Sequence, residues 1–136
     1  MQSTIMKRIY TLLLVTIVAL AACQTQKQPG DGVKGITIKY TELGRQTMFK
    51  ISCESFDKYF PKPMVMQVVS KPAIDSLMLV IDGLKRMEDE EVDVRAKIYI
   101  TNTDNKTDTL CLGINTLKYK QGTYQTPQKL LMMIQQ

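Results

Sequence analysis

Apolar and polar side chains alternate along four segments of the chain, a pattern typical of strands that bury one face of a sheet. The pattern is clearest in residues 92–101, where no position breaks the alternation. The other three segments are residues 34–40, 47–53 and 108–115. Residues 41–45 and the polar residues 102–107 have the composition of turns, so the sequence predicts two hairpins.

Helical spacing replaces this alternation in residues 73–87, which are predicted to form the main helix. Pro72 precedes this segment and suits the first turn of a helix. The apolar positions that share one stripe are Ile74, Leu77, Met78, Ile81 and Leu84. A strand over residues 77–81 is the alternative, because Leu79 and Val80 also make this stretch apolar throughout.

Shorter segments complete the predicted fold. Residues 64–69 follow two prolines and are expected to form an extended piece at a sheet edge. Residues 117–124 have the pattern of a small hairpin, and residues 128–134 that of a short helix. The sequence therefore predicts an α+β fold, a small antiparallel sheet with one main helix packed on one face and a short C-terminal helix. Residues 34–136 are expected to form a single domain.

The beginning of the chain has the three parts of a secretory signal. Lys7 and Arg8 form a basic region, residues 9–20 are mostly apolar, and small residues precede Cys23. The apolar stretch would cover about 18 Å as a helix, whereas a spanning helix must cross about 30 Å of hydrocarbon. The segment is therefore predicted to direct export and not to span a membrane.

The sequence Leu20-Ala21-Ala22-Cys23 resembles the lipobox of bacterial lipoproteins. This resemblance implies that residues 1–22 are removed as a signal peptide and that the Cys23 thiol carries acyl chains such as palmitate, which hold the protein on a membrane. An ordinary signal peptide cut after Ala22 is the alternative. Residues 23–33 are polar and contain proline and glycine, so we expect a flexible tether there.

The remainder of the chain is similar in character to the small lipoproteins of Bacteroidetes, which combine short strands, one helix and a terminal hairpin. Gln24 stands where an aspartate retains enterobacterial lipoproteins at the inner membrane. The tether also lacks the acidic cluster associated with surface display. The resemblance therefore implies a lipid-anchored protein of the cell envelope, at the outer membrane and facing the periplasm.

No histidine is present anywhere in the chain. Its absence excludes Ser-His-Asp and Cys-His catalysis and the zinc sites that use histidine. Residues 88–91 are acidic but lack the glycine and the alternating oxygen ligands of a calcium loop. We therefore predict no enzymatic activity, no metal site and no cofactor.

Two cysteines remain in the expected domain, Cys53 and Cys111, and they lack the Cys-X-X-Cys spacing of redox proteins. Cys53 is in phase with the apolar positions of its predicted strand, whereas Cys111 is out of phase with Leu110 and Leu112. Strict alternation would place the two on opposite faces, although a bulge would change this. Both a disulfide and two separate buried thiols stay open.

One face of the predicted sheet is cationic. If Ile36, Phe49, Ile51, Val94, Ala96 and Ile98 all face the helix, alternation turns the intervening residues to the opposite face. The residues of this candidate binding face are Lys39, Lys50, Arg95, Lys97 and Tyr99. We interpret it as a site for an anionic partner, such as an acidic protein segment or an envelope glycan; a solvated sheet surface is the alternative.

These features predict a membrane-tethered, exported lipoprotein that acts as a non-enzymatic binding or envelope-interaction domain. A periplasmic inhibitor or immunity-type lipoprotein fits the size and the tether equally well. Removal of Lys7 and Arg8 with the signal would lower the formal net charge from +5 to +3, so the domain is mildly basic. Export excludes nucleic acid as a partner.

The first prediction concerns acylation of Cys23. The protein extracted from membranes with detergent should exceed the mass of residues 23–136 by a lipid increment, measured by intact mass spectrometry. A Cys23→Ala variant should leave the membrane fraction, because it has no thiol to acylate. Equal retention of this variant in the membrane would contradict the prediction.

Overall fold

The computed structural model describes residues 3–10 and 26–135 of the chain. Cys23, the predicted acylation site, lies outside these residues, as does most of the predicted signal peptide. Residues 3–10 are helical. Within the described ranges, no helix is both long enough and apolar enough to cross a membrane.

A six-stranded antiparallel sheet organises residues 33–125. Its strands lie in the order β2-β1-β3-β4-β5-β6, so that β2 and β6 form the two edges. The strands are β1 (Val33–Tyr40), β2 (Met64–Val68), β3 (Ala96–Asn102), β4 (Thr107–Leu112), β5 (Thr116–Tyr119) and β6 (Gly122–Gln125). The predicted edge position of residues 64–69 is thus confirmed. The predicted hairpin around residues 102–107 (β3–β4) and the predicted small hairpin at residues 117–124 (β5–β6) are confirmed too.

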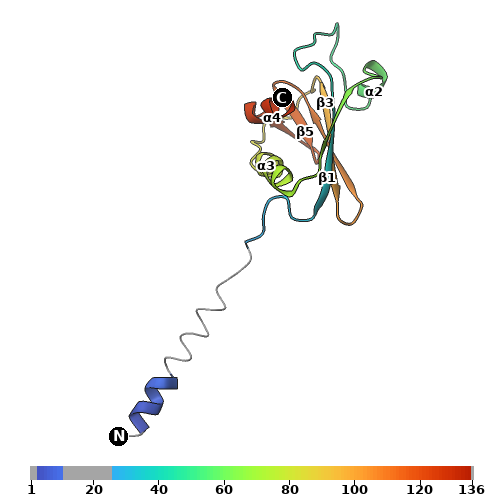
Figure 1. The fold of residues 1–136 in the computed structure, drawn as a ribbon. Helices are drawn as coiled ribbons and strands as arrows, with labels where there is room; N and C mark the ends of the chain where they lie inside the picture. The colour runs from blue at the N-terminus through green and yellow to red at the C-terminus, as the bar shows by residue number, and fades with distance from the viewer. Residues whose placement is uncertain (1–2, 11–25, 136) are drawn as a thin grey trace.

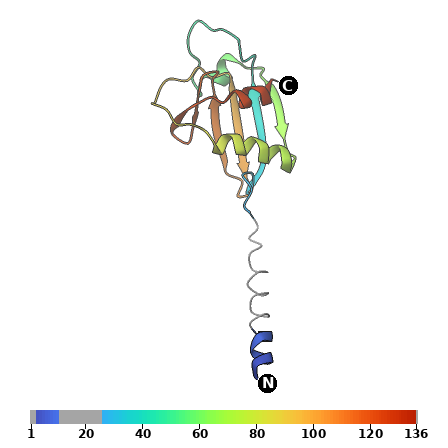
Figure 2. The same ribbon diagram turned by 90° about the vertical axis from the view of Figure 1, so that its left-hand side faces the viewer.

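Two helices cover one face of this sheet, α3 (Lys71–Asp82) and α4 (Gln128–Ile134) (Figures 1 and 2). The sheet contributes alternate side chains to the core beneath them, including Ile36, Ile98 and Leu110. Both helices present the apolar stripes that the sequence predicts, and these are buried against the sheet. The α+β fold with one main helix on one face and a short C-terminal helix is therefore confirmed.

Residues 47–53 are not a strand, and the predicted hairpin with residues 34–40 is wrong. Strand β1 already has β2 on one side and β3 on the other, which leaves no position in the ladder for this segment. Residues 47–53 instead belong to a long connection that crosses the opposite face of the sheet. Ile51 is buried there, and Phe49, which we expected in the core, is 54% exposed.

The predicted strand at residues 92–101 enters the sheet only at Ala96. A bend at Arg95 separates two parts of the segment. Val92 and Val94 are buried on the face opposite the helices, whereas Ala96 and Ile98 lie beneath them. The expectation that Val94, Phe49 and Ile51 face the main helix is therefore wrong. Apolar and polar residues alternate through the bend, but the apolar residues before it are buried on one face of the sheet and those after it on the other.

The main helix is shorter than predicted and ends at Asp82. Gly83 follows as its C-cap, and residues 85–87 then run along the edge of β6. The Met87 backbone N–H donates to Thr123 O at 3.0 Å, and the Gln125 N–H donates to Lys85 O at 2.9 Å. The last residues of the predicted helix therefore extend the sheet.

Part of the expected tether contacts the domain. The Gly30 backbone N–H donates to the Asp75 carboxylate at 3.1 Å, and Asp31 forms an ion pair with Lys71 at 3.1 Å. Both contacts lie at the N-terminal end of α3. Residues 30 and 31 thus belong to the folded part of the chain and lie at the end of β1 where the chain enters the sheet (Figure 1).

The packing of α3 generates the second prediction. Leu77→Ala should lower the free energy of unfolding by about 2 to 5 kcal/mol, because Leu77 is buried against the sheet. Leu79→Ala is the matched control in the same helix; Leu79 is 58% exposed, so its truncation should change stability by no more than about 0.5 kcal/mol. Urea denaturation measures both. Equal effects would mean that the buried face of α3 is misplaced.

Candidate functional site

The face of the sheet opposite α3 and α4, called the outer face below, is covered at one end by the connection between β1 and β2. This connection contains the short helix α2 (Phe56–Tyr59). It buries a second, smaller apolar cluster against the sheet, made of Ile51, Phe56, Phe60, Val92, Val94 and Cys111. The domain therefore has a main core under two helices and a thin outer layer on the other side.

A disulfide joins Cys53 of this connection to Cys111 of β4, with 5.8 Å between the Cα atoms. Cys111 faces the outer side, as its phase in β4 predicts. Cys53 reaches it because residues 47–53 are not a strand, so the expected opposition of the two faces does not apply. The bond closes a loop spanning 58 positions, and loop entropy gives a stabilisation of about 4 kcal/mol.

The buried guanidinium of Arg95 donates hydrogen bonds to the same connection. Its Nε–H donates to Arg45 O at 2.8 Å, and Nη1 donates to Asp93 Oδ1 at 2.6 Å and to Val94 O at 2.9 Å. Nη2 donates to Asp93 Oδ2 and to Thr47 Oγ1, both at 2.9 Å. All five N–H donors of the side chain therefore have partners.

Arg95 consequently does not belong to an exposed cationic face, and this part of the predicted binding face is wrong. The residue is only 3% exposed, and it has no donor left for a carboxylate or phosphate of a partner. Its role is to position the connection: it fixes the backbone of Arg45 and the side chain of Thr47. Asp93 completes this hub by accepting the Ile51 backbone N–H at 2.8 Å.

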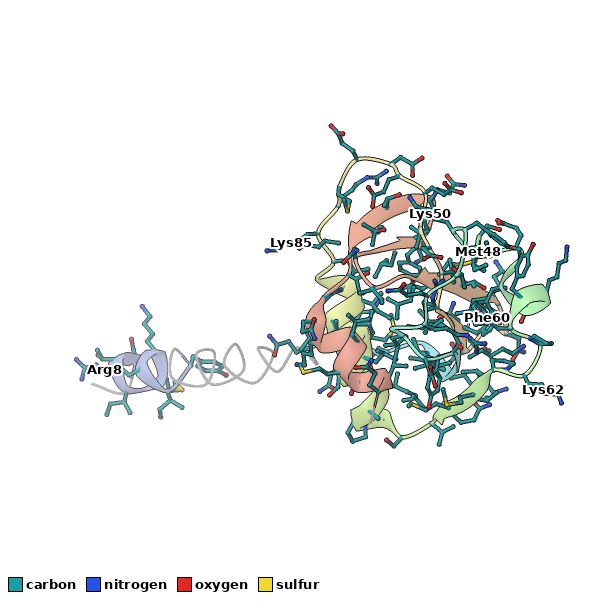
Figure 3. All side chains as sticks on the ribbon, turned by 90° about the horizontal axis from the view of Figure 1, so that it is seen from above. Arg8, Met48, Lys50, Phe60, Lys62 and Lys85 are labelled. Atoms are coloured by element: carbon teal, nitrogen blue, oxygen red, sulfur yellow. A yellow bond between two sulfur atoms is a disulfide. The ribbon has the colours of Figure 1, made fainter. Side chains whose placement is uncertain are left out.

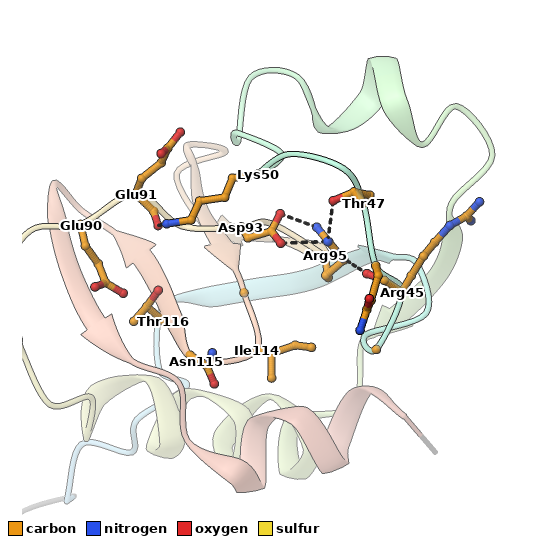
Figure 4. A pocket seen from close by; sticks show the side chains of 13 residues that line it. Arg45, Thr47, Lys50, Glu90, Glu91, Asp93, Arg95, Ile114, Asn115 and Thr116 are labelled. Atoms are coloured by element: carbon orange, nitrogen blue, oxygen red, sulfur yellow. Dashed lines mark hydrogen bonds and ion pairs between the residues drawn. The ribbon is translucent and has the colours of Figure 1, made fainter.

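A pocket of about 370 Å³ lies beside this hub (Figure 4). The pocket is lined by residues 44–47 and 113–116 and by Lys50, Glu90, Glu91, Asp93 and Arg95. Gly113 allows the turn to approach closely, because a Cβ atom there would lie 2.8 Å from the Asp93 carbonyl oxygen. Lys50 lies at the rim and donates to Glu91 O at 3.4 Å.

Three apolar side chains project from the outer layer next to the pocket. We call Met48, Phe49 and Tyr59 the apolar tip. Met48 is fully exposed, and Phe49 packs edge-to-face against Tyr59 with 5.1 Å between ring centroids. Figure 3 looks onto this end of the domain, with Met48 and Lys50 at its surface.

Cations border the apolar tip. Lys50 follows Phe49 directly, and the Lys58 ammonium lies 5.5 Å from the Tyr59 ring centroid. The Arg45 guanidinium lies 5.7 Å from the ring centroid of Phe60, the buried residue that follows Tyr59. Met48 and Phe49 therefore form an exposed apolar patch bordered by positive charge, and such patches are typical of interaction sites.

The other predicted binding residues share the outer face. Lys39 and Lys97 are directly opposite each other in the pairing of β1 with β3, and both ammonium groups lie within 6 Å of the Tyr99 ring centroid, at 5.6 and 5.7 Å. Asp57 of α2 bridges them, at 3.8 Å from Lys39 and 3.1 Å from Lys97. One carboxylate thus offsets one of the two positive charges.

Lys97 stays protonated in this setting. Burial lowers the pKa of its ammonium group, but the interactions with Asp57 and Tyr99 outweigh burial and hold the pKa above its ordinary value. Lys50 lies apart from this group, at the pocket rim and not in a strand. The structure therefore brings together Lys39, Lys97 and Tyr99, and separates Lys50 and Arg95 from them by position and burial.

Sequence reasoning missed two parts of this surface. Lys118 of β5 pairs with Cys111, which pairs with Lys97, so it continues the same row across the sheet. The pattern of the predicted small hairpin at residues 117–124 does not indicate that Lys118 pairs with Cys111. The alternation in residues 47–53 assigns Phe49 to the core, and no local pattern indicates that it packs against Tyr59; the adjacent Met48, an exposed apolar residue, is the one signal in this loop.

The exposed apolar tip and the neighbouring cations are suited to binding through surface contacts. Among the described residues, no group of three or more Cys, Asp or Glu side chains is placed to hold a metal ion.

Comparison of the chain with protein-family models, with curated proteins and with solved structures finds no match.

The Arg95 hub generates the third prediction. Asp93→Ala should lower the free energy of unfolding by about 1 to 3 kcal/mol, because it removes the carboxylate from the buried Arg95 guanidinium, although the Asp93 side chain is 40% exposed and water can partly replace it. Asp57→Ala is the control: it removes two ion pairs of an exposed carboxylate and should cost less than about 1 kcal/mol. Thermal and urea denaturation compare the two. If Asp93→Ala is as stable as Asp57→Ala, the hub does not hold the outer layer.

Proposed function

We propose that the protein is a lipid-anchored lipoprotein of the cell envelope whose domain binds another envelope protein through the apolar tip, without catalysing a reaction. The observation that carries this proposal is the loop at residues 45–50, which exposes Met48 completely and is nevertheless fixed in place. Side chains that are exposed in the free protein and become buried at the centre of an interface contribute much of its binding energy.

The loop is held on both sides of Met48. Arg95 contacts the backbone of Arg45 and the hydroxyl of Thr47, and Asp93 accepts the backbone N–H of Ile51. A loop fixed in this way loses little conformational entropy on binding, so more of the contact energy appears as affinity.

The position of the tip agrees with a tethered protein. Residues 30 and 31 lie at one end of β1, and the loop at residues 45–50 follows its other end (Figure 1). Eight strand residues separate the two ends by about 24 Å. A domain anchored through residues N-terminal to β1 would therefore direct the tip away from its membrane, toward other envelope components.

The surroundings of the tip define the chemistry of its partner. Met48 and Phe49 fit an apolar pocket, and the neighbouring Lys50 and Lys58 favour carboxylates around that pocket. The row of Lys39, Lys97 and Lys118 on the adjoining outer face extends this preference, although Asp57 and Asp89 offset part of its charge. A protein with an apolar depression bordered by acidic residues is the expected partner.

An inhibitor or immunity-type lipoprotein is the second candidate. The same observation favours it, because a fixed loop with a fully exposed apolar side chain is suited to insertion into the cleft of an enzyme. The two candidates differ in the partner: an enzyme whose activity falls on binding supports the inhibitor.

The fourth prediction tests the tip. A photoreactive phenylalanine analogue at Met48 should cross-link a specific envelope protein in cells that produce the full chain, whereas the same analogue at Met132, an exposed methionine of α4, should not. The captured protein should then bind purified wild type, and Phe49→Ala should weaken that binding about thirtyfold, the effect of losing about 2 kcal/mol.

Met132→Ala is the matched control for the affinity measurement and should bind as wild type. If Phe49→Ala and Met132→Ala bind the captured protein equally well, the tip is not the binding site. Equally strong cross-linking from positions 48 and 132 would likewise show that the tip is not the binding site.

A further inference from the structure

The two edges of the sheet differ in whether another segment of the chain pairs with them. At β6, residues 85–87 add a further paired segment: an isolated bridge joins Arg86 and Tyr124, and backbone hydrogen bonds lie on either side of it. The Asp89 carboxylate secures this segment by accepting a hydrogen bond from the Thr123 hydroxyl at 2.6 Å. The edge of β6 is therefore covered by the chain itself.

The edge at β2 has no such cover. Within the described part of the chain, β2 pairs with β1 alone and ends the strand order (Figure 2). Its five residues pair with β1 in continuous register, without a bulge. The outer side of an antiparallel edge strand presents backbone N–H and C=O groups that can pair with another strand.

The side chains of this edge favour such pairing. Residues 64–69 read Met-Val-Met-Gln-Val-Val and contain no charge and no proline. Val65 is 57% exposed and Val69 is 73% exposed. Natural edge strands are blunted by lysine, proline or bulges, and none of these devices occurs within this segment.

We propose that β2 pairs antiparallel with β2 of a second copy of this chain, which joins the two six-stranded sheets into one. The two-fold axis lies at Gln67, so that Gln67 of each copy is opposite Gln67 of the other. This register places Val65 opposite Val69 on the outer face and Met66 opposite Val68 on the face of the helices. Val65 and Val69, the two most exposed apolar side chains of the edge, thereby become neighbours, whereas Met64 lies opposite Ser70.

The charge distribution of the edge is compatible with a second copy as the occupant. The residues that pair, 65–69, carry no charge, and the nearest cations lie outside the strand, Lys62 before it and Lys71 in α3. Lys71 is also paired within its own chain with Asp31 and Asp75. A self-pairing edge therefore meets no electrostatic penalty, and it offers nothing to attract a charged strand of another protein.

The contact is small. Stable interfaces use about 20 to 30 residues a side, far more than the six of this segment. The dimer should therefore be weak in dilute solution and form at high protein concentration, as on a crowded surface.

Cysteine cross-linking tests the register in the full chain, in a Cys23→Ser background so that residue 23 contributes no thiol. Opposite residues of antiparallel strands have Cα atoms about 4.5 to 5.5 Å apart, within the range of a disulfide. Gln67→Cys should therefore form a disulfide-linked dimer under mild oxidation. Thr109→Cys is the matched control, exposed on the same outer face but in the interior strand β4, and should cross-link at least tenfold less.

A charge test gives an independent measurement by sedimentation. Gln67→Lys and Gln67→Glu should each abolish the dimer at concentrations where the wild type forms it, because like charges then meet on the axis. A mixture of the two variants should restore it. Cross-linking of Gln67→Cys no stronger than that of Thr109→Cys, or charge variants that dimerise as wild type, would overturn the proposal; a cross-link to a different protein in cells would also do so and would assign the edge to that partner.

Discussion

The outer layer of the domain depends on the buried guanidinium of Arg95. A single side chain joins the β3 end of the sheet to the backbone at Arg45, the hydroxyl of Thr47 and the carboxylate of Asp93. Lysine could not replace it, because an ammonium group donates from one nitrogen and lacks the planar fork. The guanidinium is buried but the Asp93 side chain is 40% exposed, so the ion pair itself adds little net stability. The hydrogen bonds of Arg95 fix the backbone at Arg45 and the side chain of Thr47, which lie in the loop that carries Met48.

The two faces of the sheet are consequently built by different means. Beneath α3 and α4, many apolar side chains pack together, and small changes in their identity would be tolerated. On the outer face, a six-residue apolar cluster is supplemented by the Arg95 hub and by the Cys53–Cys111 disulfide. Residues that contact partners are commonly found on loops positioned by a rigid scaffold. The pocket and the apolar tip lie in this outer layer.

Local patterns predicted the inner layer well and the outer layer poorly. Alternation identified Ile36, Ile98 and Leu110 because their strands lie fully in the ladder. Ile51 is buried as its pattern suggests. Alternation does not show, however, which face of the sheet a residue packs against, or whether the neighbouring strand still has an unpaired edge. Arg95 was placed on the surface because nothing local marks an arginine whose donors are all satisfied by distant segments. The candidate site depends on those contacts.

The disulfide has a consequence for where the protein can be active. In a reducing compartment Cys53 and Cys111 would remain thiols, and the connection that carries the apolar tip would lose its covalent attachment to the sheet. The inner layer contains no cysteine and would assemble regardless. Without the disulfide, the Arg95 hub and the apolar cluster would hold the connection through non-covalent contacts alone, so the local stability of the outer layer, and not that of the inner layer, depends on the redox state of the surroundings.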